Sequence, residues 1–454
     1  MRNPTIAKVG TPAAARIVSA TAVKAGLPLA GLATQPAGTA NEYRTANPSV
    51  GGNTAASIAS LTLCHFSTAH TELKSRSFHR QCIPLAASGV HVRYVSPAPF
   101  QEPSRGIDFV CVPNSTSRLR RVFAGVALVK SLLAQRADIY HFQDTELFPT
   151  ALALKLAFRK RVVYDAYEDF PSMARGSTRV PRIFKALAAK TVAGLEQLAS
   201  RFFDGVMTAD PITMRRIAHS GNSRKLVFYN FPNLDFFPAP PPGPKIFDMV
   251  YRGGIADRAG TAVLLDAMHL LSMRGRRLRL LLLGYFDNSA AEAALRERIS
   301  RMGLATSVEL RGRLAHEGMA EILSLARVGV SPLQDTPKFR INIPVKIFEY
   351  WACGLPVIAS DLPPIRPFFR NLRAGLLFPP GDAGALSLCI GWMLDHPSEA
   401  NRMGRCGRQA ITERFNNDRE SHKFRDFCIR VAKPRARQDM ETRTNVGTSY
   451  SRKF

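Results

Sequence analysis

Residues 340–361 read RINIPVKIFEYWACGLPVIASD, and this stretch decides the fold. Pro344 stands where a helix can begin, the amphipathic run after it has helical spacing, and Gly354 is a typical helix stop. The apolar residues 356–360 that follow predict a buried parallel strand. A helix, a tight turn and a buried strand together indicate half of a doubly wound α/β domain.

Lys346 and Glu349 lie three residues apart, so they share one face of the predicted helix. They lie near the positive end of the helix dipole, where an anionic phosphate group would also bind. The carboxylate of Glu349 could accept two hydrogen bonds from a ribose diol while Lys346 offsets diphosphate charge. The spacing alone also fits an ordinary surface ion pair, and this alternative stays open.

The string PVKIFEYWACGLPVIAS resembles the donor-site signature of family 4 (group 1) glycosyltransferases, in the branch P-x-K-x-x-E-Y-x-A-x-G-x-P-V-x-A-S. The resemblance implies the α/β GT-B fold, two facing doubly wound, Rossmann-like domains with a cleft between them. It also implies a sugar transfer with retention of configuration and no metal, in which Glu349 holds the ribose of the nucleotide sugar. The acidic donor-sugar contact of many members is replaced by Ile341, with Asn342 the nearest polar candidate.

The first predicted strand, within residues 61–66, leads into a loop that contains His70. The loop and the helix after it resemble the family pattern H-x-x-x-D-x-R-x-F-x-K-x-C-x-x-L, with Arg76 and Phe78 in step and Lys74 where Asp is usual. A histidine at the carboxyl end of a first strand points toward the ligand crevice of an open α/β sheet. An acceptor-side role and a plain helix-capping role are both open for His70.

Two further strand ends carry acidic loops that resemble H-D-P-E-L-x-P and Y-D-x-H-E-D-x-P of the same branch, with two histidines replaced, by Gln143 and Tyr167. Four carboxylates at neighbouring strand ends would line one crevice, and we expect Asp144 and Glu168 to orient the acceptor hydroxyl. The alternative is a purely structural role, in which such residues cap helices. The four are Asp144, Glu146, Glu168 and Asp169.

The second domain is predicted to begin with a strand over residues 247–251 and a turn over 252–260. Gly253 and Gly254 would let the backbone approach a phosphate closely. Arg258 stands where family members carry the Arg or Lys that grips the diphosphate. We therefore expect Gly253, Gly254, Arg258, Lys346 and Glu349 to bind the donor.

Composition and the Pro-rich stretch suggest the domain organisation. The last predicted helix would brace the first domain, as in the family. The segments are a disordered or targeting-like tail 1–57, an acceptor-side domain 58–235, a linker 236–245, a donor domain 246–417, a crossover helix 418–433 and a basic tail 434–454.

The net charge is +27, of which +11 lies in residues 58–238, so polyanions are attracted to the body of the protein. The basic helical region predicted over 178–217 is either a solvated face or a surface for anionic lipid. No run of eighteen apolar residues occurs, so we expect any membrane contact to be peripheral. Seven scattered cysteines without metal or disulfide spacing favour a reducing, cytoplasmic compartment.

Other functional classes fit less well. A nicotinamide dehydrogenase should show G-x-G-x-x-G after its first strand, and no glycine follows closely here. No helix-turn-helix, zinc or RNA-binding signature supports a nucleic-acid partner. The expected partners are a nucleotide-sugar donor and a glycan or lipid-linked acceptor, with no cofactor. A catalytically impaired scaffold stays open because of Ile341, Gln143 and Tyr167.

Overall fold

The computed structural model describes residues 61–68, 75–97, 105–113, 127–176, 180–217, 224–238, 243–314, 318–370 and 372–433. These residues form two compact units. The N-terminal domain comprises the described residues up to Asn230 and returns at Asn417 for the last helix, and the C-terminal domain spans Phe231 to Asn416. The tails predicted over 1–57 and 434–454 and the loop residue His70 lie outside the described residues.

The N-terminal domain is built on a seven-stranded parallel sheet in the order β3-β2-β1-β4-β5-β6-β7. The chain runs outward from β1 on one side and then from β4 on the other, which is the doubly wound arrangement. The strands are β1 (Thr62–Phe66), β2 (His91–Ser96), β3 (Ile107–Cys111), β4 (Ile139–Phe142), β5 (Arg161–Ala166), β6 (Gly205–Thr208) and β7 (Arg224–Val227).

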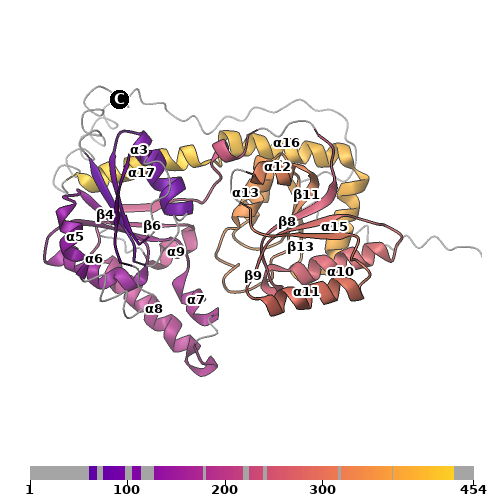
Figure 1. The fold of residues 1–454 in the computed structure, drawn as a ribbon, viewed down its shortest axis with the longest axis horizontal. Coiled ribbons are helices and arrows are strands. Elements are labelled where there is room, and N and C mark those ends of the chain that lie inside the picture. Colours follow the sequence, from indigo (N-terminus) through magenta and orange to yellow (C-terminus); the bar gives the residue numbers. More distant parts are fainter. Residues whose placement is uncertain are drawn as a thin grey trace, which may run out of the picture. The chain divides into compact units, whose positions relative to one another are not determined.

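Helices join these strands and cover the sheet (Figure 1). Between β1 and β2 the predicted helix is a π-helix, η1 (Ser75–Cys82), continued by α3 (Ile83–Ala87), and it buries Phe78, Cys82 and Leu85 as expected. The others are α5 (Val129–Ala134), η2 (Thr145–Leu147), α6 (Phe148–Leu156), α7 (Phe170–Gly176), η3 (Arg182–Phe184), α8 (Lys185–Ser200) and α9 (Pro211–Ile217).

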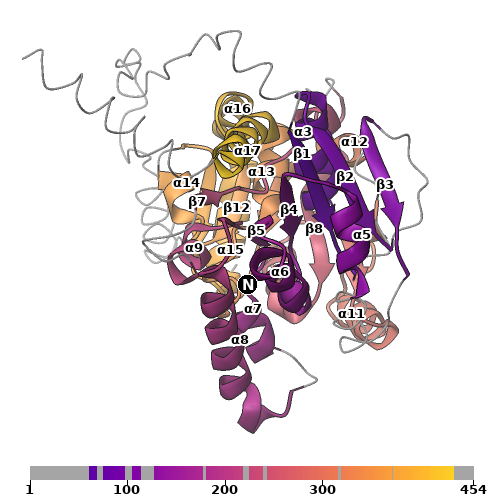
Figure 2. The same ribbon diagram turned by 90° about the vertical axis from the view of Figure 1, so that its left-hand side faces the viewer.

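The last helix, α17 (Asn417–Ala432), belongs to the N-terminal domain, as the sequence predicts. Its residues Phe424, Phe427 and Val431 are buried in the same apolar cluster as Leu63 of β1. Figure 2 shows α17 running beside α3. This helix therefore completes a core whose other residues precede the whole C-terminal domain.

The C-terminal domain holds a second, six-stranded parallel sheet in the order β10-β9-β8-β11-β12-β13. Its chain order reverses between β8 and β11. The strands are β8 (Phe247–Ile255), β9 (Leu280–Phe286), β10 (Val308–Arg311), β11 (Ala326–Ser331), β12 (Val357–Ser360) and β13 (Gly375–Phe378).

The predicted helix and strand of residues 340–361 are present as α13 (Val345–Ala352) and β12. Pro344 precedes the helix, and Gly354 adopts φ 70° just after it, a left-handed backbone that suits glycine. The remaining helices are η4 (Leu234–Phe236), η5 (Asp257–Ala259), α10 (Thr261–Ser272), α11 (Ser289–Arg301), α12 (Met319–Ser324), α14 (Arg366–Arg370), α15 (Ala383–Asp395) and α16 (Pro397–Glu413).

Two parts of the predicted organisation differ from the structure. The boundary falls at Phe231, not after residue 235, because the Phe231 ring packs 4.8 Å from that of Phe348 in the C-terminal domain. The described residues 236–238 and 243–245 of the predicted linker thus belong to that domain. The region 178–217, predicted as helical, also contains the strand β6, a short run whose four residues are all buried.

None of the helices within the described ranges is both long and apolar enough to cross a membrane.

Candidate functional site

The candidate donor site lies at the carboxyl end of β8, next to the point where the strand order of the C-terminal sheet reverses. Open α/β sheets bind ligands at such points. Gly253 and Gly254 lie in β8 and not in the predicted turn, because β8 pairs with β9 as far as Ile255. Gly253 has φ 138°, and a Cβ on Gly284 would lie 1.8 Å from its carbonyl oxygen, so the two backbones approach closely.

Lys346 reaches from α13 to this strand end. Its Nζ lies 4.0 Å from the centroid of the Tyr251 ring, and a Cβ on Gly253 would be 3.0 Å from the same Nζ. Desolvation of the ammonium and the charge of Arg252 lower the pKa of Lys346, the Glu349 carboxylate opposes both, and the resulting pKa is about 7. The ammonium makes no hydrogen bond or ion pair with the part of the chain that is described. It is a cation without an anionic partner.

Glu349 lies one turn further along α13 and is fully buried. Its Oε2 accepts a hydrogen bond of 2.6 Å from Nη1 of Arg252, and its buried Oε1 has no partner among the described residues. The surface Lys346–Glu349 pair that the spacing allowed is therefore not formed. A buried carboxylate oxygen without a donor is costly, and a ligand hydroxyl would satisfy it.

Arg258 is placed differently from the expectation. It lies in η5 and forms a two-pronged ion pair with Asp287, at 2.7 and 3.0 Å. More than half of its side chain is exposed, so this pair stabilises little. A diphosphate would compete with the Asp287 carboxylate for this guanidinium or bind its remaining N–H groups.

A buried polar network lies at the carboxyl ends of β4 and β5 in the N-terminal domain. Asp165 accepts hydrogen bonds from Arg76 at 2.9 and 2.7 Å, from Gln81 at 2.9 Å and from Gln143 at 2.8 Å. Burial alone would raise the pKa of Asp165, but Arg76 outweighs it and holds the pKa below its ordinary value. Arg76 also donates to the carbonyl of Phe228, so the network ties the helix η1 to the sheet.

Two histidines extend this network toward β1. Nδ1 of His65 lies 3.0 Å from Nδ1 of His141, so one ring donates and the other accepts. Burial lowers the pKa of His141 to about 4, despite the opposing charge of Asp165. His141 is therefore neutral near pH 7, which lets the pair share one hydrogen.

The predicted acceptor-side residues are only partly brought together. Asp144 is buried and accepts a hydrogen bond of 3.0 Å from the hydroxyl of Ser67, at the end of β1. Glu168 is half-buried in the loop after β5. Asp169 instead caps α7 by accepting a hydrogen bond from the amide of Ser172, which is the helix-capping alternative.

Sequence reasoning did not assign Arg252 or Asp165 to a site. Arg252 fixes the carboxylate of Glu349, and Asp165 is the centre of the N-terminal network. The position of Arg252 next to Gly253 could have indicated a site residue. Its partner Glu349, however, lies 97 residues away in the chain, so the sequence did not reveal the pair.

The C-terminal domain is similar to a known family of proteins. Residues 247–396 match the family described as "Glycosyl transferases group 1". Amylovoran biosynthesis glycosyltransferase AmsK of Erwinia amylovora is 25% identical over 39% of this chain and 43% of its own length. Phosphatidyl-myo-inositol mannosyltransferase of Mycobacterium leprae is 30% identical over 34% of this chain. The matches span only about two fifths of these relatives, 43% and 38%.

Solved structures match over both domains. Sucrose-phosphate synthase of Thermosynechococcus elongatus has a TM-score of 0.64 at 20% identity and covers 80% of this chain and 97% of its own. HepE of Anabaena, in complex with UDP-glucose, has a TM-score of 0.61 at 14% identity, with 81% and 98% covered. The chain thus has the two parallel-sheet, Rossmann-like domains of GT-B proteins, and residues 247–396 are similar to group 1 glycosyltransferases.

Proposed function

We propose that this protein is a glycosyltransferase that moves a sugar from a nucleotide-sugar donor to a hydroxyl acceptor. The observation that carries the proposal is the unpartnered Oε1 of Glu349, buried beside the unpaired ammonium of Lys346 and the backbone of Gly253. A ribose diol supplies the donors that Glu349 lacks, and a diphosphate supplies the anion that Lys346 lacks.

In the proposed reaction, negative charge grows on the leaving diphosphate as the glycosidic bond breaks. Lys346 and the amino end of α13 would stabilise this charge without a metal, and Arg258 would join them after releasing Asp287. Arg252 would hold Glu349 in place through its 2.6 Å hydrogen bond. Retention of configuration is the outcome that the resemblance to family 4 implies.

The N-terminal domain would bind the acceptor, with Asp144, Glu168 and His70 as the groups that orient its hydroxyl. A glycan or lipid-linked acceptor in polysaccharide or glycoconjugate synthesis is consistent with the names of two relatives, an amylovoran biosynthesis glycosyltransferase and a phosphatidyl-myo-inositol mannosyltransferase. We place the reaction in the cytoplasm, where nucleotide sugars are available.

The test is to screen a panel of nucleotide sugars for a rise in melting temperature and for donor hydrolysis. A ligand that binds only the folded protein raises stability by RT ln(1 + [L]/Kd). Binding together with slow hydrolysis supports an active enzyme. Binding without any turnover supports the impaired scaffold instead, and no binding by any nucleotide sugar contradicts the proposal.

Replacing Glu349 with alanine is expected to weaken donor binding by roughly 10- to 150-fold. The change removes charge-assisted hydrogen bonds worth on the order of 1.5–3 kcal/mol. Isothermal titration with the nucleotide sugar found in the screen measures it. Glu321→Ala, on α12 of the same domain, is the control, and its affinity should equal that of the parent. Unchanged affinity in Glu349→Ala would remove this residue from the donor site.

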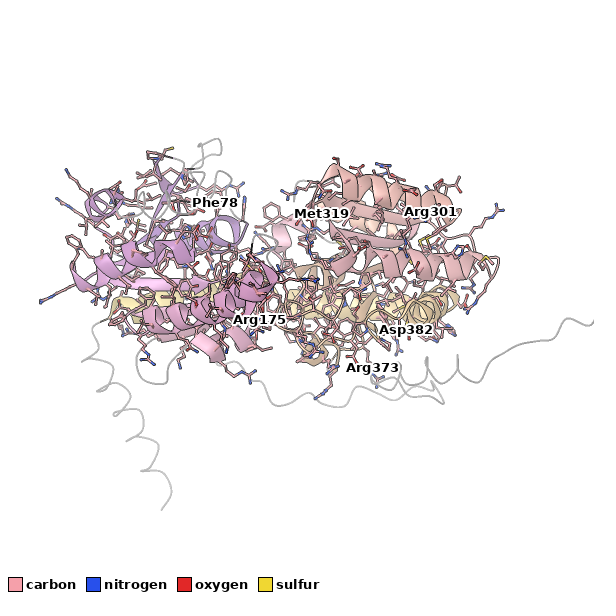
Figure 3. The ribbon with its side chains drawn as sticks, turned by 90° about the horizontal axis from the view of Figure 1, so that it is seen from below. Phe78, Arg175, Arg301, Met319, Arg373 and Asp382 are labelled. Atoms are coloured by element: carbon pink, nitrogen blue, oxygen red, sulfur yellow. The ribbon has the colours of Figure 1, made fainter. Side chains whose placement is uncertain are left out.

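We also propose peripheral contact with anionic membrane through the helical hairpin of α7, η3 and α8, which reaches away from the N-terminal sheet (Figure 2). At its tip Ile183 is 81% exposed, Leu187 63% and Phe184 53%. Arg182, Lys185 and Lys190 lie among these apolar residues, and Arg175 lies at the end of α7 (Figure 3). Apolar residues flanked by cations suit an anionic lipid surface.

The charges on the hairpin of α7, η3 and α8 favour an anionic membrane. The acidic residue of α8, Glu196, is buried and bonded to Tyr164 and Arg216, so it does not oppose the cations. The same ion pair holds Arg216, which lies within the basic region 178–217, away from the exposed face.

The triple variant Arg182→Gln, Lys185→Gln, Lys190→Gln is expected to weaken binding to acidic liposomes by up to about 100-fold at low salt. Each cation near such a surface contributes about 1 kcal/mol, and salt screens it. Co-sedimentation with neutral and acidic vesicles measures the effect. Equal binding of the parent protein to both kinds of vesicle would exclude an electrostatic contact.

A further inference from the structure

A basic pocket lies at the amino ends of β4 to β7, the sheet edge opposite to that of the Asp165 network. It has a volume of about 530 Å³. Residues just before or at the start of four neighbouring strands line it, together with the ends of α6 and α17. Its six cations are Lys155, Arg159, Lys160, Arg161, Arg224 and Lys433.

The two carboxylates that line this pocket already accept hydrogen bonds from the protein. Asp204 receives both hydrogen bonds of Lys155, at 2.6 and 2.8 Å, and a third from the amide of Val162. Asp138 accepts from the amide of Thr62 on β1. Both acids therefore help to hold the strands together, and Asp204 neutralises Lys155.

The side chains of three consecutive cations of the pocket have no bonding partner among the described residues. Arg159, Lys160 and Arg161 make no side-chain hydrogen bond or ion pair with any residue that the structure describes. Arg159 also has φ 53°, a left-handed backbone that residues other than glycine rarely adopt. This backbone turn directly follows α6 and brings the three cations to the pocket.

The simplest role for these cations would be to neutralise the negative carboxyl ends of α6 and α17. Their positive charge is larger than those two helix ends require. Six cations and two carboxylates leave a net charge of +4. The carboxyl ends of α6 and α17 together offset only about one unit, at roughly half a charge each. The unpaired cations Arg159, Lys160 and Arg161 therefore carry more charge than the helix ends require.

We propose that the basic pocket binds an anion that carries two or more phosphate groups. The planar guanidinium groups of Arg159 and Arg161 match phosphate oxygens in pairs, and Lys160 adds a point charge. None of the described residues that line the pocket is aromatic, so they offer no platform for stacking a base. The pocket thus recognises the phosphates themselves, and it lies in a different domain from the candidate donor site.

The test is titration calorimetry with inorganic tripolyphosphate at fixed ionic strength. The triple variant Arg159→Gln, Lys160→Gln, Arg161→Gln is expected to bind at least about tenfold more weakly than the parent. Lys433→Glu places an opposing charge at the exposed end of α17, with little risk to folding, and should weaken binding about threefold or more.

Two controls separate this pocket from other causes. The hairpin variant Arg182→Gln, Lys185→Gln, Lys190→Gln removes the same charge from the same domain and should keep tripolyphosphate binding within about twofold. Lys245→Met, an exposed lysine of the C-terminal domain, should also keep it. Full binding by the Arg159–Arg161 triple variant, or equal loss in the hairpin variant or in Lys245→Met, would each overturn the proposal.

Discussion

Lys346→Met is expected to lower kcat by about 10²- to 10³-fold, the typical loss when one preorganised group that stabilises developing negative charge is removed. The ammonium is fixed between the Tyr251 ring and the backbone of Gly253, so it needs no rearrangement to meet a leaving diphosphate. Steady-state kinetics with the donor found in the screen measures the effect. Lys245→Met, an exposed lysine of the same domain that donates to the carbonyl of Ser324, should keep the parent kcat.

The lowered pKa gives a second readout of the same residue. With a pKa of about 7, Lys346 is mostly neutral at pH 8 and mostly charged at pH 6 in the free protein. A bound diphosphate favours the charged form, so binding should take up close to one proton at pH 8 and almost none at pH 6. Donor affinity should then fall as pH rises above 7. Calorimetry in buffers of different ionisation enthalpy measures this uptake, and its persistence in Lys346→Met would show that Lys346 is not the group.

Asp165→Ala is expected to destabilise the N-terminal domain by about 3–5 kcal/mol. Removing one partner of a buried ion pair leaves the charge of Arg76 without compensation, and the amides of Gln81 and Gln143 also lose their acceptor. Hydrogen exchange of the β4 and β5 amides measures this domain separately, since a chain of two domains need not unfold in one step.

The control for this effect is Asp108→Ala in the same domain. Asp108 is 75% exposed and lies 3.8 Å from Arg93, and an exposed pair of this kind contributes about 0–1 kcal/mol. A loss below about 1 kcal/mol in Asp165→Ala would mean that the domain relaxes to solvate Arg76, and that the network does not hold η1 to the sheet.

Local patterns predicted much of the fold. The spacing of apolar residues, together with Pro344 and Gly354, predicted α13 and β12 because helix starts, stops and buried strands depend on neighbours in the chain. The same reasoning missed the strand β6, whose four residues are too few for a periodic pattern. It also placed the domain boundary too late, since only the fold brings the ring of Phe231 to that of Phe348.

The candidate site was also predicted only in part from the sequence. The helical spacing of Lys346 and Glu349 predicted two side chains on one face, and the structure adds that their partners differ. Glu349 pairs with Arg252, and Asp165 pairs with Arg76 89 residues away. Such partners follow from the order of strands in the sheet, which no local pattern encodes. His70 lies outside the described residues, so its acceptor-side role stays a prediction.

The place of α17 in the N-terminal core has a consequence for how the protein is made. The ribosome completes the strands of the first domain and must then synthesise residues 231–416 before the helix that covers them exists. At about 5–20 residues per second this takes roughly 10–40 s. During that interval Phe228 and its neighbours in the cluster lack the cover of Phe424 and Phe427. The nascent chain therefore presents an apolar face to the cell until its last helix emerges, and chaperones that hold such faces would bind it in that interval.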